Sequence, residues 1–236
     1  MTDAAEKEVV RLFMKIVAFE PIKLNSQRLP EKNKLLLAGR PLCYHLTNTL
    51  LQVSEIDEVY VFCSSDEVRD YVPAGTRFLK RDGYYDGDGV KSLELIGKFI
   101  DCVDADIYVF ANTTSPFLKA DSVSNAIRHV MDGGYDSAVT VREFKTFALY
   151  RGKPLNYNSN DIPKTQEIEP VYVETSGAYI FKKEIFTKHH RRLGFHPYMQ
   201  IVDEIEGVDI DTREDFDYAQ ILAGLAVSSR RPDEIR

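Results

Sequence analysis

Short apolar runs alternate with amphipathic stretches along most of this chain. The runs Ile16–Phe19, Glu58–Ser64 and Asp106–Ala111 are rich in β-branched and aromatic residues, which predicts buried strands. Stretches with apolar residues three and four apart, such as Pro41–Val53, predict helices that pack on those strands. Strands and helices that alternate in this way are typical of a Rossmann-like, mostly parallel α/β sheet.

The same pattern predicts one domain over residues 14–225. Residues 1–13, with a helix-like stretch at Ala4–Phe13, are predicted to be an N-terminal extension, and residues 226–236 a polar tail. The remaining strands are predicted at Arg77–Lys80, Ser137–Val141, Ala178–Phe181 and Tyr198–Val202, and the remaining helices at Val90–Cys102, Ala120–Met131, Ile185–Arg192 and Asp215–Leu225.

The alternation breaks at about Arg142. Phe144–Glu174 contains three prolines and many polar residues, and it has no long periodicity. Such a segment predicts an insertion with its own small sheet or hairpin, which often serves as an oligomer contact or a lid.

Composition narrows the function classes. The formal net charge of −7 argues against a nucleic-acid partner, because a phosphate backbone requires a basic face. No apolar run approaches 18 residues and the N-terminus is polar, so we expect no membrane span, no signal peptide and a cytoplasmic location. The three cysteines lack CxxC spacing, which is typical of reduced core thiols.

A cationic loop follows the first predicted strand. In an open α/β sheet, ligands bind at the carboxyl ends of the strands, and three cations in one short loop favour a polyanion such as a triphosphate. Lysine and arginine in loops are also typical of solvated surface, and the glycines of a Walker or Rossmann fingerprint are absent. The cations are Lys23, Arg28 and Lys32, with the small polar residues Asn25, Ser26 and Gln27 between them.

Two aspartates near the C-terminus form a candidate metal site. If the segment EGVDID were a strand, Asp209 and Asp211 would project to the same face, and a hard cation such as Mg²⁺ would relieve their repulsion. The alternative is that one aspartate belongs to a cap or turn while the other is solvated. Thr212 is predicted to cap the last helix.

Two further junctions carry polar residues. Asn112–Pro116 (NTTSP) follows the strand Asp106–Ala111, where its amide and hydroxyls suit either a base or sugar contact or simple turn and cap chemistry. Arg81, Asp88 and Ser92 lie at another strand-to-helix junction. The histidines show no metalloprotease or triad arrangement, and no nucleophile elbow is present.

Taken together, five segments resemble in order the motifs of the cytidylyltransferases that activate acidic nine- and eight-carbon sugars, the CMP-N-acetylneuraminate and CMP-Kdo synthetase family. The resemblance covers residues 14–225. The segments are Lys23–Lys32 (KLNSQRLPEK), Arg81–Ser92 (RDGYYDGDGVKS), Asn112–Pro116 (NTTSP), Ser176–Tyr179 (SGAY) and Asp209–Thr212 (DIDT).

The resemblance implies a homodimeric, single-domain enzyme with the fold of the nucleotide-diphospho-sugar transferases. Residues from about 143 to 185 would protrude as a dimerisation segment. The implied reaction joins CTP to an acidic acceptor, gives the CMP conjugate and pyrophosphate, and serves surface polysaccharide biosynthesis. Mg²⁺ would be held by Asp209 and Asp211.

The resemblance also implies roles for individual residues. Catalytic roles fall to Arg28, Lys32 and Asp211. Nucleotide-binding positions are Lys23, Asn25, Ser26, Gln27, Arg28, Lys32, Arg81, Asp88 and Ser92, and acceptor-binding positions are Asn112, Thr114, Ser115, Lys145, Glu174 and Tyr179, with Phe195 nearby.

Some positions depart from the family pattern. Lys23 and Glu174 stand where the family has arginine, Gln27 stands in place of a lysine, and Asn112 replaces a glutamine. Glu174 reverses a charge, so it would repel an acidic substrate or bind a cationic one, and the sequence leaves the acceptor unidentified. Two alternatives stay open: a nucleotide-binding homologue with impaired catalysis, and a GT-A-like glycosyltransferase, which would place its DxD motif nearer mid-chain.

Overall fold

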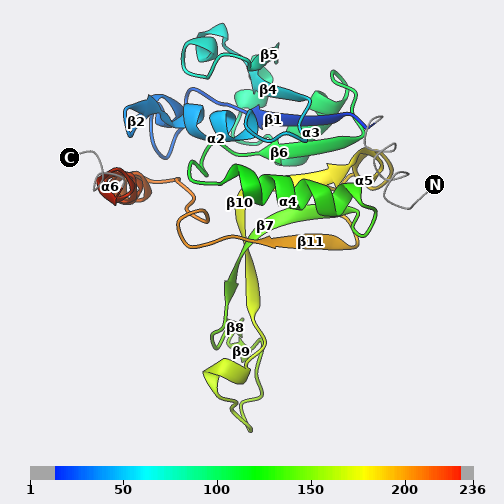
Figure 1. The fold of residues 1–236 in the computed structure, drawn as a ribbon, viewed down its shortest axis with the longest axis vertical. Helices are drawn as coiled ribbons and strands as arrows, with labels where there is room; N and C mark the ends of the chain where they lie inside the picture. Colours follow the sequence, from blue (N-terminus) through cyan, green and yellow to red (C-terminus); the bar gives the residue numbers. More distant parts are fainter. Residues whose placement is uncertain (1–13, 230–236) are drawn as a thin grey trace, which may run out of the picture.

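A seven-stranded sheet forms the centre of the computed structural model, which describes residues 14–229 (Figure 1). The strand order is β11-β7-β10-β6-β1-β4-β5. All neighbouring strands are parallel except β10, which is antiparallel to both β6 and β7. The strands are β1 (Ile16–Pro21), β4 (Glu58–Cys63), β5 (Arg77–Lys80), β6 (Ile107–Ala111), β7 (Ser137–Phe144), β10 (Val171–Lys182) and β11 (Pro197–Ile201). The predicted mostly parallel α/β class is confirmed.

Helices cover both faces of the sheet. The larger helices are α2 (Leu42–Leu50), α3 (Ser92–Ile100), α4 (Ala120–Met131), α5 (Lys183–His189) and α6 (Arg213–Ser229). Short elements complete the fold: 3-10 helices η1 (Lys32–Lys34), η2 (Asp66–Asp70), η3 (Gly83–Asp86) and η4 (Thr165–Glu167), and two-residue strands β2 (Leu36–Leu37), β3 (Arg40–Pro41), β8 (Leu149–Tyr150) and β9 (Lys153–Pro154). Because both faces are covered, β6 is apolar at every position and β1 at every position except Glu20, rather than at alternate positions.

The two faces have separate hydrophobic cores. On one face, Ile16 and Ala18 of β1 pack with Leu46 of α2 and with side chains of α4. On the other, Val17 and Phe19 pack with residues of α3 and α5. This alternation along β1 is the two-residue period of an extended strand. It holds β1 rigidly between the layers, so the loop that leaves its carboxyl end starts from a defined point.

The segment between β7 and β10 projects from the body as a narrow arm (Figure 1). Pairing of β7 with β10 runs from Glu174↔Val141 out to Val171↔Phe144, and the β8–β9 hairpin lies farther along the arm. A hairpin connection can join only antiparallel strands, which explains why β10 alone is reversed. The predicted segment 143–185 is longer than the projection, because residues 175–185 belong to the sheet and to α5.

No helix within residues 14–229 is long and apolar enough to cross a membrane. The expected helix-like stretch at Ala4–Phe13 lies outside the described residues, as does the end of the chain beyond residue 229.

One carboxyl group is enclosed in this fold. Glu20, near the end of β1, is fully buried, and the Thr47 hydroxyl of α2 donates to its Oε2. Its Oε1 has no hydrogen-bond partner. Burial raises the pKa of Glu20 from 4.5 to about 8, and the Thr47 hydrogen bond only partly opposes this.

Glu20→Gln is expected to stabilise the protein at alkaline pH. A folded-state pKa above the unfolded one means that the stability contribution of Glu20 is complete below pH 4.5 and is lost as the pH rises through about 8. At pH 9 the loss has an upper limit of ~3–5 kcal/mol, which the neutral glutamine avoids. Urea unfolding between pH 5 and pH 9 measures the difference. A gain that did not grow with pH would contradict the assignment.

Glu55→Gln serves as the matched control. Glu55 is also buried, but hydrogen bonds from Arg128 and Ser124 outweigh that burial and hold its pKa below its ordinary value. This variant should lose stability above pH 5 rather than gain it.

Candidate functional site

Four segments that are distant in sequence meet where the carboxyl ends of β1 and β6 lie. The loop after β1, residues 22–35, contacts Asp88 after η3, Thr113 after β6, and Asp211 before α6. In open α/β sheets this edge is the usual ligand-binding position. The geometry therefore joins the cationic loop to the distant aspartates, as the sequence patterns predict.

Asp211 holds two of the three loop cations that were predicted to bind a polyanion. Arg28 Nη1 lies 2.7 Å from Asp211 Oδ2, and Lys32 Nζ lies 3.1 Å from Oδ1. Lys32 Nζ also donates to the Ile210 carbonyl at 2.7 Å. Lys32 is only 8 % exposed, so its charge needs both of these acceptors. The N-terminal loop is thereby fastened to the C-terminal segment.

Asp88 holds the third cation. Lys23 Nζ lies 2.9 Å from Asp88 Oδ1, and the Gln27 amide donates to the other carboxylate oxygen. A pocket of about 450 Å³ opens between the two carboxylates. Its lining residues are Lys23, Ser26, Gln27, Arg28, Leu29, Lys32, Asp88 and Asp211. Asn25 belongs to the same loop but is exposed and does not line the pocket.

Asn33 is a positioning residue that the sequence patterns do not single out. It is buried, its Nδ2 donates to the Lys23 carbonyl at 2.7 Å, and its Oδ1 accepts from the Thr113 hydroxyl at 2.7 Å. It therefore ties the loop to the end of β6. Asparagine in a polar loop is common, so only these tertiary contacts distinguish it.

Arg81 lies beneath the loop rather than in the pocket. Its side chain is 1 % exposed and pairs with Asp86 at 2.7 Å. It donates to the Ile22 carbonyl at 2.9 Å and to the Phe62 carbonyl. In this conformation Arg81 has almost no surface for a nucleotide, so a direct nucleotide contact stays a prediction. A buried guanidinium instead fixes the start of the loop against β4.

The segment with Asp209 and Asp211 is a loop, so the prediction of a strand is wrong. The backbone here is held by Ile210 N donating to the Thr114 carbonyl at 2.9 Å and by Asp211 N donating to Asp215 at 3.0 Å. The predicted cap is confirmed, because Asp215 N donates to the Thr212 hydroxyl at 3.2 Å. Asp215 in turn accepts from the Thr212 backbone at 2.8 Å, which makes a reciprocal cap.

The environment of Asp209 suits a cation. Its Oδ1 is buried and has no hydrogen-bond partner. Burial raises the pKa of the Asp209 carboxyl above its ordinary value, a hydrogen bond from Thr114 opposes the rise, and the negative charge of Asp211 adds to it. No cluster of three or more histidine, cysteine or acidic side chains gathers for a metal within residues 14–229. Two carboxylates completed by substrate phosphates are sufficient for Mg²⁺.

A second group of side chains surrounds Tyr179 on β10. The Tyr179 hydroxyl donates to Glu174 at 2.6 Å and accepts from Arg192 at 3.0 Å. Arg192 also donates to Ser92 at 3.3 Å, and its guanidinium lies 3.8 Å from the centre of the Tyr179 ring. Three of these residues were predicted at the site. The sequence patterns do not predict Arg192 at the site, because a basic run at the end of a predicted helix is typical of solvated surface.

The remaining predicted positions are dispersed. Asn112 donates to the Ser176 carbonyl at 2.6 Å, which places it beside Glu174. Ser115 is fully buried, and its hydroxyl has no partner among the described residues. Lys145 is exposed on the arm. Phe195 lies at the opposite edge of the sheet, where its backbone donates to Asp136 just before β7, so the expectation that it borders the acceptor is wrong.

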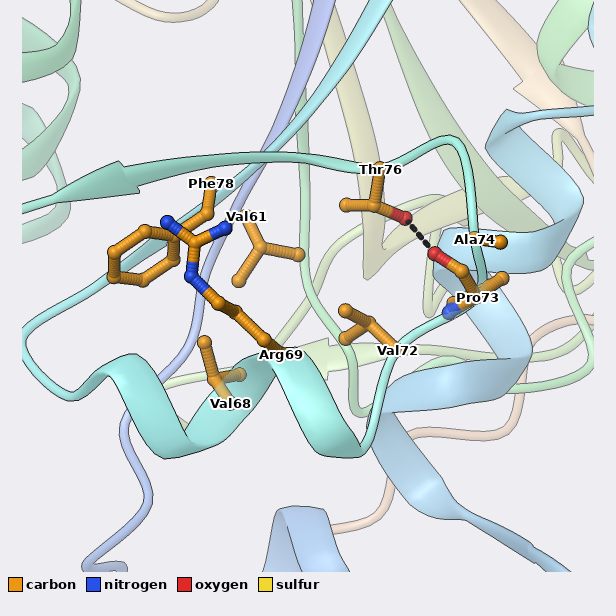
Figure 2. Close-up of a pocket in the computed structure, with 8 residues that line it drawn as sticks. All are labelled: Val61, Val68, Arg69, Val72, Pro73, Ala74, Thr76 and Phe78. Carbon is orange, nitrogen blue, oxygen red and sulfur yellow. Dashed lines mark hydrogen bonds between the residues drawn. The ribbon is translucent and has the colours of Figure 1, made fainter.

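A second pocket, of about 320 Å³, lies beside the edge strand β5 (Figure 2). Arg69 extends over the Phe78 ring at 4.3 Å, and the Thr76 hydroxyl donates to the Pro73 carbonyl at 2.8 Å. The lining residues are Val61, Val68, Arg69, Val72, Pro73, Ala74, Thr76 and Phe78. With no carboxylate and one cation in its lining, this pocket lacks the groups for phosphoryl or metal chemistry.

Comparison with known proteins identifies the family. The model of the cytidylyltransferase family matches residues 21–230, so the chain belongs to that family. It is 24 % identical over 214 residues to an N-acylneuraminate cytidylyltransferase of Streptococcus agalactiae, covering 86 % of this chain and 52 % of that protein. It is 26 % identical over 235 residues to CMP-N,N'-diacetyllegionaminic acid synthase of Legionella pneumophila, covering 90 % and 97 %.

The fold has a close counterpart among solved structures. CMP:2-keto-3-deoxy-manno-octonic acid synthetase complexed with CTP superimposes with a TM-score of 0.71 at 18 % identity, covering 90 % of this chain and 99 % of that one. The chain spans about half the length of the N-acylneuraminate cytidylyltransferase that it matches.

Arg81→Met is expected to destabilise the protein by about 1–3 kcal/mol, because the Ile22 carbonyl loses the Arg81 donor and the half-buried Asp86 loses its ion pair, although Asp86 keeps its hydrogen bond from Ser64. Urea unfolding measures this loss. Lys80→Met is the control, since its ion pair with Asp66 is exposed to solvent and contributes little to stability. If Arg81→Met kept wild-type stability but lost CTP binding, the result would indicate a direct contact between Arg81 and the nucleotide.

Proposed function

We propose that this chain transfers CMP from CTP to a hydroxyl of an acidic sugar and releases pyrophosphate. The observation that carries the proposal is the pocket at the carboxyl end of β1, where Lys23, Arg28 and Lys32 converge next to two aspartates. The family membership and the acidic-sugar relatives support the same reaction. Because CTP is an intracellular nucleotide, we also propose that the reaction takes place in the cytoplasm.

In this reaction the acceptor oxygen attacks the α-phosphorus of CTP while the bond from that phosphorus to the bridging oxygen breaks. Negative charge develops on the departing pyrophosphate, and the proton of the acceptor hydroxyl passes to solvent. Lys23, Arg28 and Lys32 would stabilise that charge by exchanging their present carboxylate partners for phosphate oxygens. Electrostatic stabilisation of this kind is the main contribution of a protein to phosphoryl transfer.

The charges of the pocket support a divalent cation as cofactor. The three cations stand against Asp88, Asp209 and Asp211, so the protein alone offers a triphosphate little net positive charge. Asp209 and Asp211 would hold Mg²⁺, with the partnerless Oδ1 of Asp209 as one ligand. When bound, Mg²⁺ supplies Lewis-acid stabilisation of the phosphate oxygens.

Asp211→Ala and Asp209→Asn are expected to lower pyrophosphate release by at least about 100-fold, because each removes a charged ligand of the transition state. The assay combines CTP and Mg²⁺ with a panel of sialic, Kdo-type and legionaminic acids. Asp217→Asn is the matched control, since this exposed aspartate pairs only with Arg213 on α6 among the described contacts. Retained activity in both variants would exclude the metal assignment.

A binding measurement accompanies this assay. The thermal shift produced by CTP should depend on Mg²⁺ in the wild-type chain, and Asp209→Asn should lose that dependence while keeping its own stability. A wild-type chain that binds CTP with Mg²⁺ but releases no pyrophosphate with any acid would identify a nucleotide-binding homologue without catalysis.

We further propose that the arm forms a homodimer. Large apolar side chains on it are at least half exposed, which is unusual for a surface without a partner. They are Leu149, Tyr150, Leu155, Ile162 and Val173.

Leu149→Asp combined with Leu155→Asp should convert the dimer to a monomer, because two charges would be buried without partners at the interface. Light scattering after size exclusion measures the mass. Tyr218→Asp, an equally exposed apolar position on α6, is the control and should leave the mass unchanged. A wild-type chain that is monomeric at high concentration would contradict the proposal.

A further inference from the structure

Arg192 and Glu174 face each other without forming a tight ion pair. The nearest guanidinium nitrogen and carboxylate oxygen are 3.8 Å apart, and the side chains are 30 % and 48 % exposed. Arg192 donates one hydrogen bond from Nη1 and one from Nη2. A guanidinium has five N–H groups, so Arg192 keeps further donors for a ligand. Both charges therefore keep capacity to bind a ligand.

The backbone of β10 is distorted where Glu174 and Tyr179 meet. Five residues apart in a regular strand, they would point to opposite faces and lie ~16 Å apart. The register of β10 shifts between these two residues, and Ser176 has a left-handed φ of 60°. The bulge brings the Tyr179 hydroxyl within 2.6 Å of Glu174. Bulges commonly re-aim side chains at functional sites.

Tyr179 orients both charges. Its hydroxyl donates to Glu174 and accepts from Arg192, and the guanidinium carbon of Arg192 lies over its ring, 3.8 Å from the ring centre. Arginine stacked on an aromatic ring is held in one orientation, which lowers the entropy lost when it binds a carboxylate.

Two short segments of chain connect this cluster with the carboxyl-end site. Ser92 accepts a hydrogen bond from Arg192 and lies four residues after Asp88, the ion-pair partner of Lys23. On the other side, Asn112 at the end of β6 binds the Ser176 carbonyl, two residues after Glu174. A molecule that reacts with a nucleotide in the pocket would meet these side chains next.

We propose that Arg192 and Glu174 together recognise the acceptor, and that this acceptor carries an anionic group and a strong hydrogen-bond donor, such as a protonated amine. This inference rests on the proposed function. The acceptor carboxylate would bind Arg192 bidentately, and the donor would bind Glu174. The pair has no net charge, so an acid without such a donor leaves Glu174 facing a second anion, which is unfavourable. Arg192 and Glu174 are thus specificity residues.

The test compares two blocked ligands that bind but do not react, the methyl glycosides of neuraminic acid, with a free amine, and of N-acetylneuraminic acid, with an amide. Titration calorimetry measures their affinity for the full chain in the presence of CTP and Mg²⁺. The wild-type chain should prefer the amine by about 10-fold, since a charge-assisted hydrogen bond to Glu174 replaces the weaker one that a neutral amide can donate.

Two variants test the contributions of Arg192 and Glu174 to binding separately. Arg192→Met should weaken both glycosides by about 10- to 100-fold. Glu174→Gln should reduce the preference for the amine to within about 2-fold. Arg191→Met is the matched control, because this neighbouring arginine lies over Phe195 at the opposite edge of the sheet. In every variant the CTP affinity and the melting temperature report whether the pocket and the fold are intact.

The outcomes distinguish this inference from the proposed function. Pyrophosphate release with unchanged glycoside binding in Arg192→Met would overturn the inference and keep the function. Glycoside binding that depends on Arg192 without turnover of any acid would overturn the function and keep the inference. Failure of the wild-type chain to bind either glycoside would overturn the inference.

Discussion

The site depends on one buried cation. Lys32 lies in the 3-10 turn η1 of the first loop, and its ammonium group reaches the Ile210 carbonyl and the Asp211 carboxylate, 178 and 179 residues away. A lysine with so little exposure is costly to bury unless both acceptors are present. The contact therefore couples the position of the first loop to that of the C-terminal segment, and Asp211 extends the coupling to Arg28.

The three loop cations that line the pocket already have carboxylate partners: Asp88 for Lys23, and Asp211 for Arg28 and Lys32. Such pairing holds the basic side chains in fixed positions, so the cationic groups are already arranged before a polyanion binds. It also means that the carboxylates compete with the ligand for the same donors. A phosphate chain has to replace these pairs, and the freed aspartates are then available to a divalent cation.

Local patterns anticipated most elements because strand and helix periods are properties of neighbouring residues. The helix at Ala120–Met131 and the strand at Arg77–Lys80 have the predicted bounds. The patterns failed where contacts between distant residues decide the outcome. Asp209 and Asp211 lie in a loop whose backbone binds the distant Thr114 carbonyl through Ile210 N.

The sequence by itself determined the α/β class, the cationic loop and the aspartate pair, since these follow from residue types at short spacing. Only the tertiary structure decided which charges meet. It buried Arg81 beneath the loop and moved Phe195 to the opposite edge of the sheet. It also brought Arg192 to Tyr179 and Glu174. The physical reason is that electrostatic contacts depend on distance and burial in three dimensions, and neither quantity is encoded in the spacing of residues along the chain.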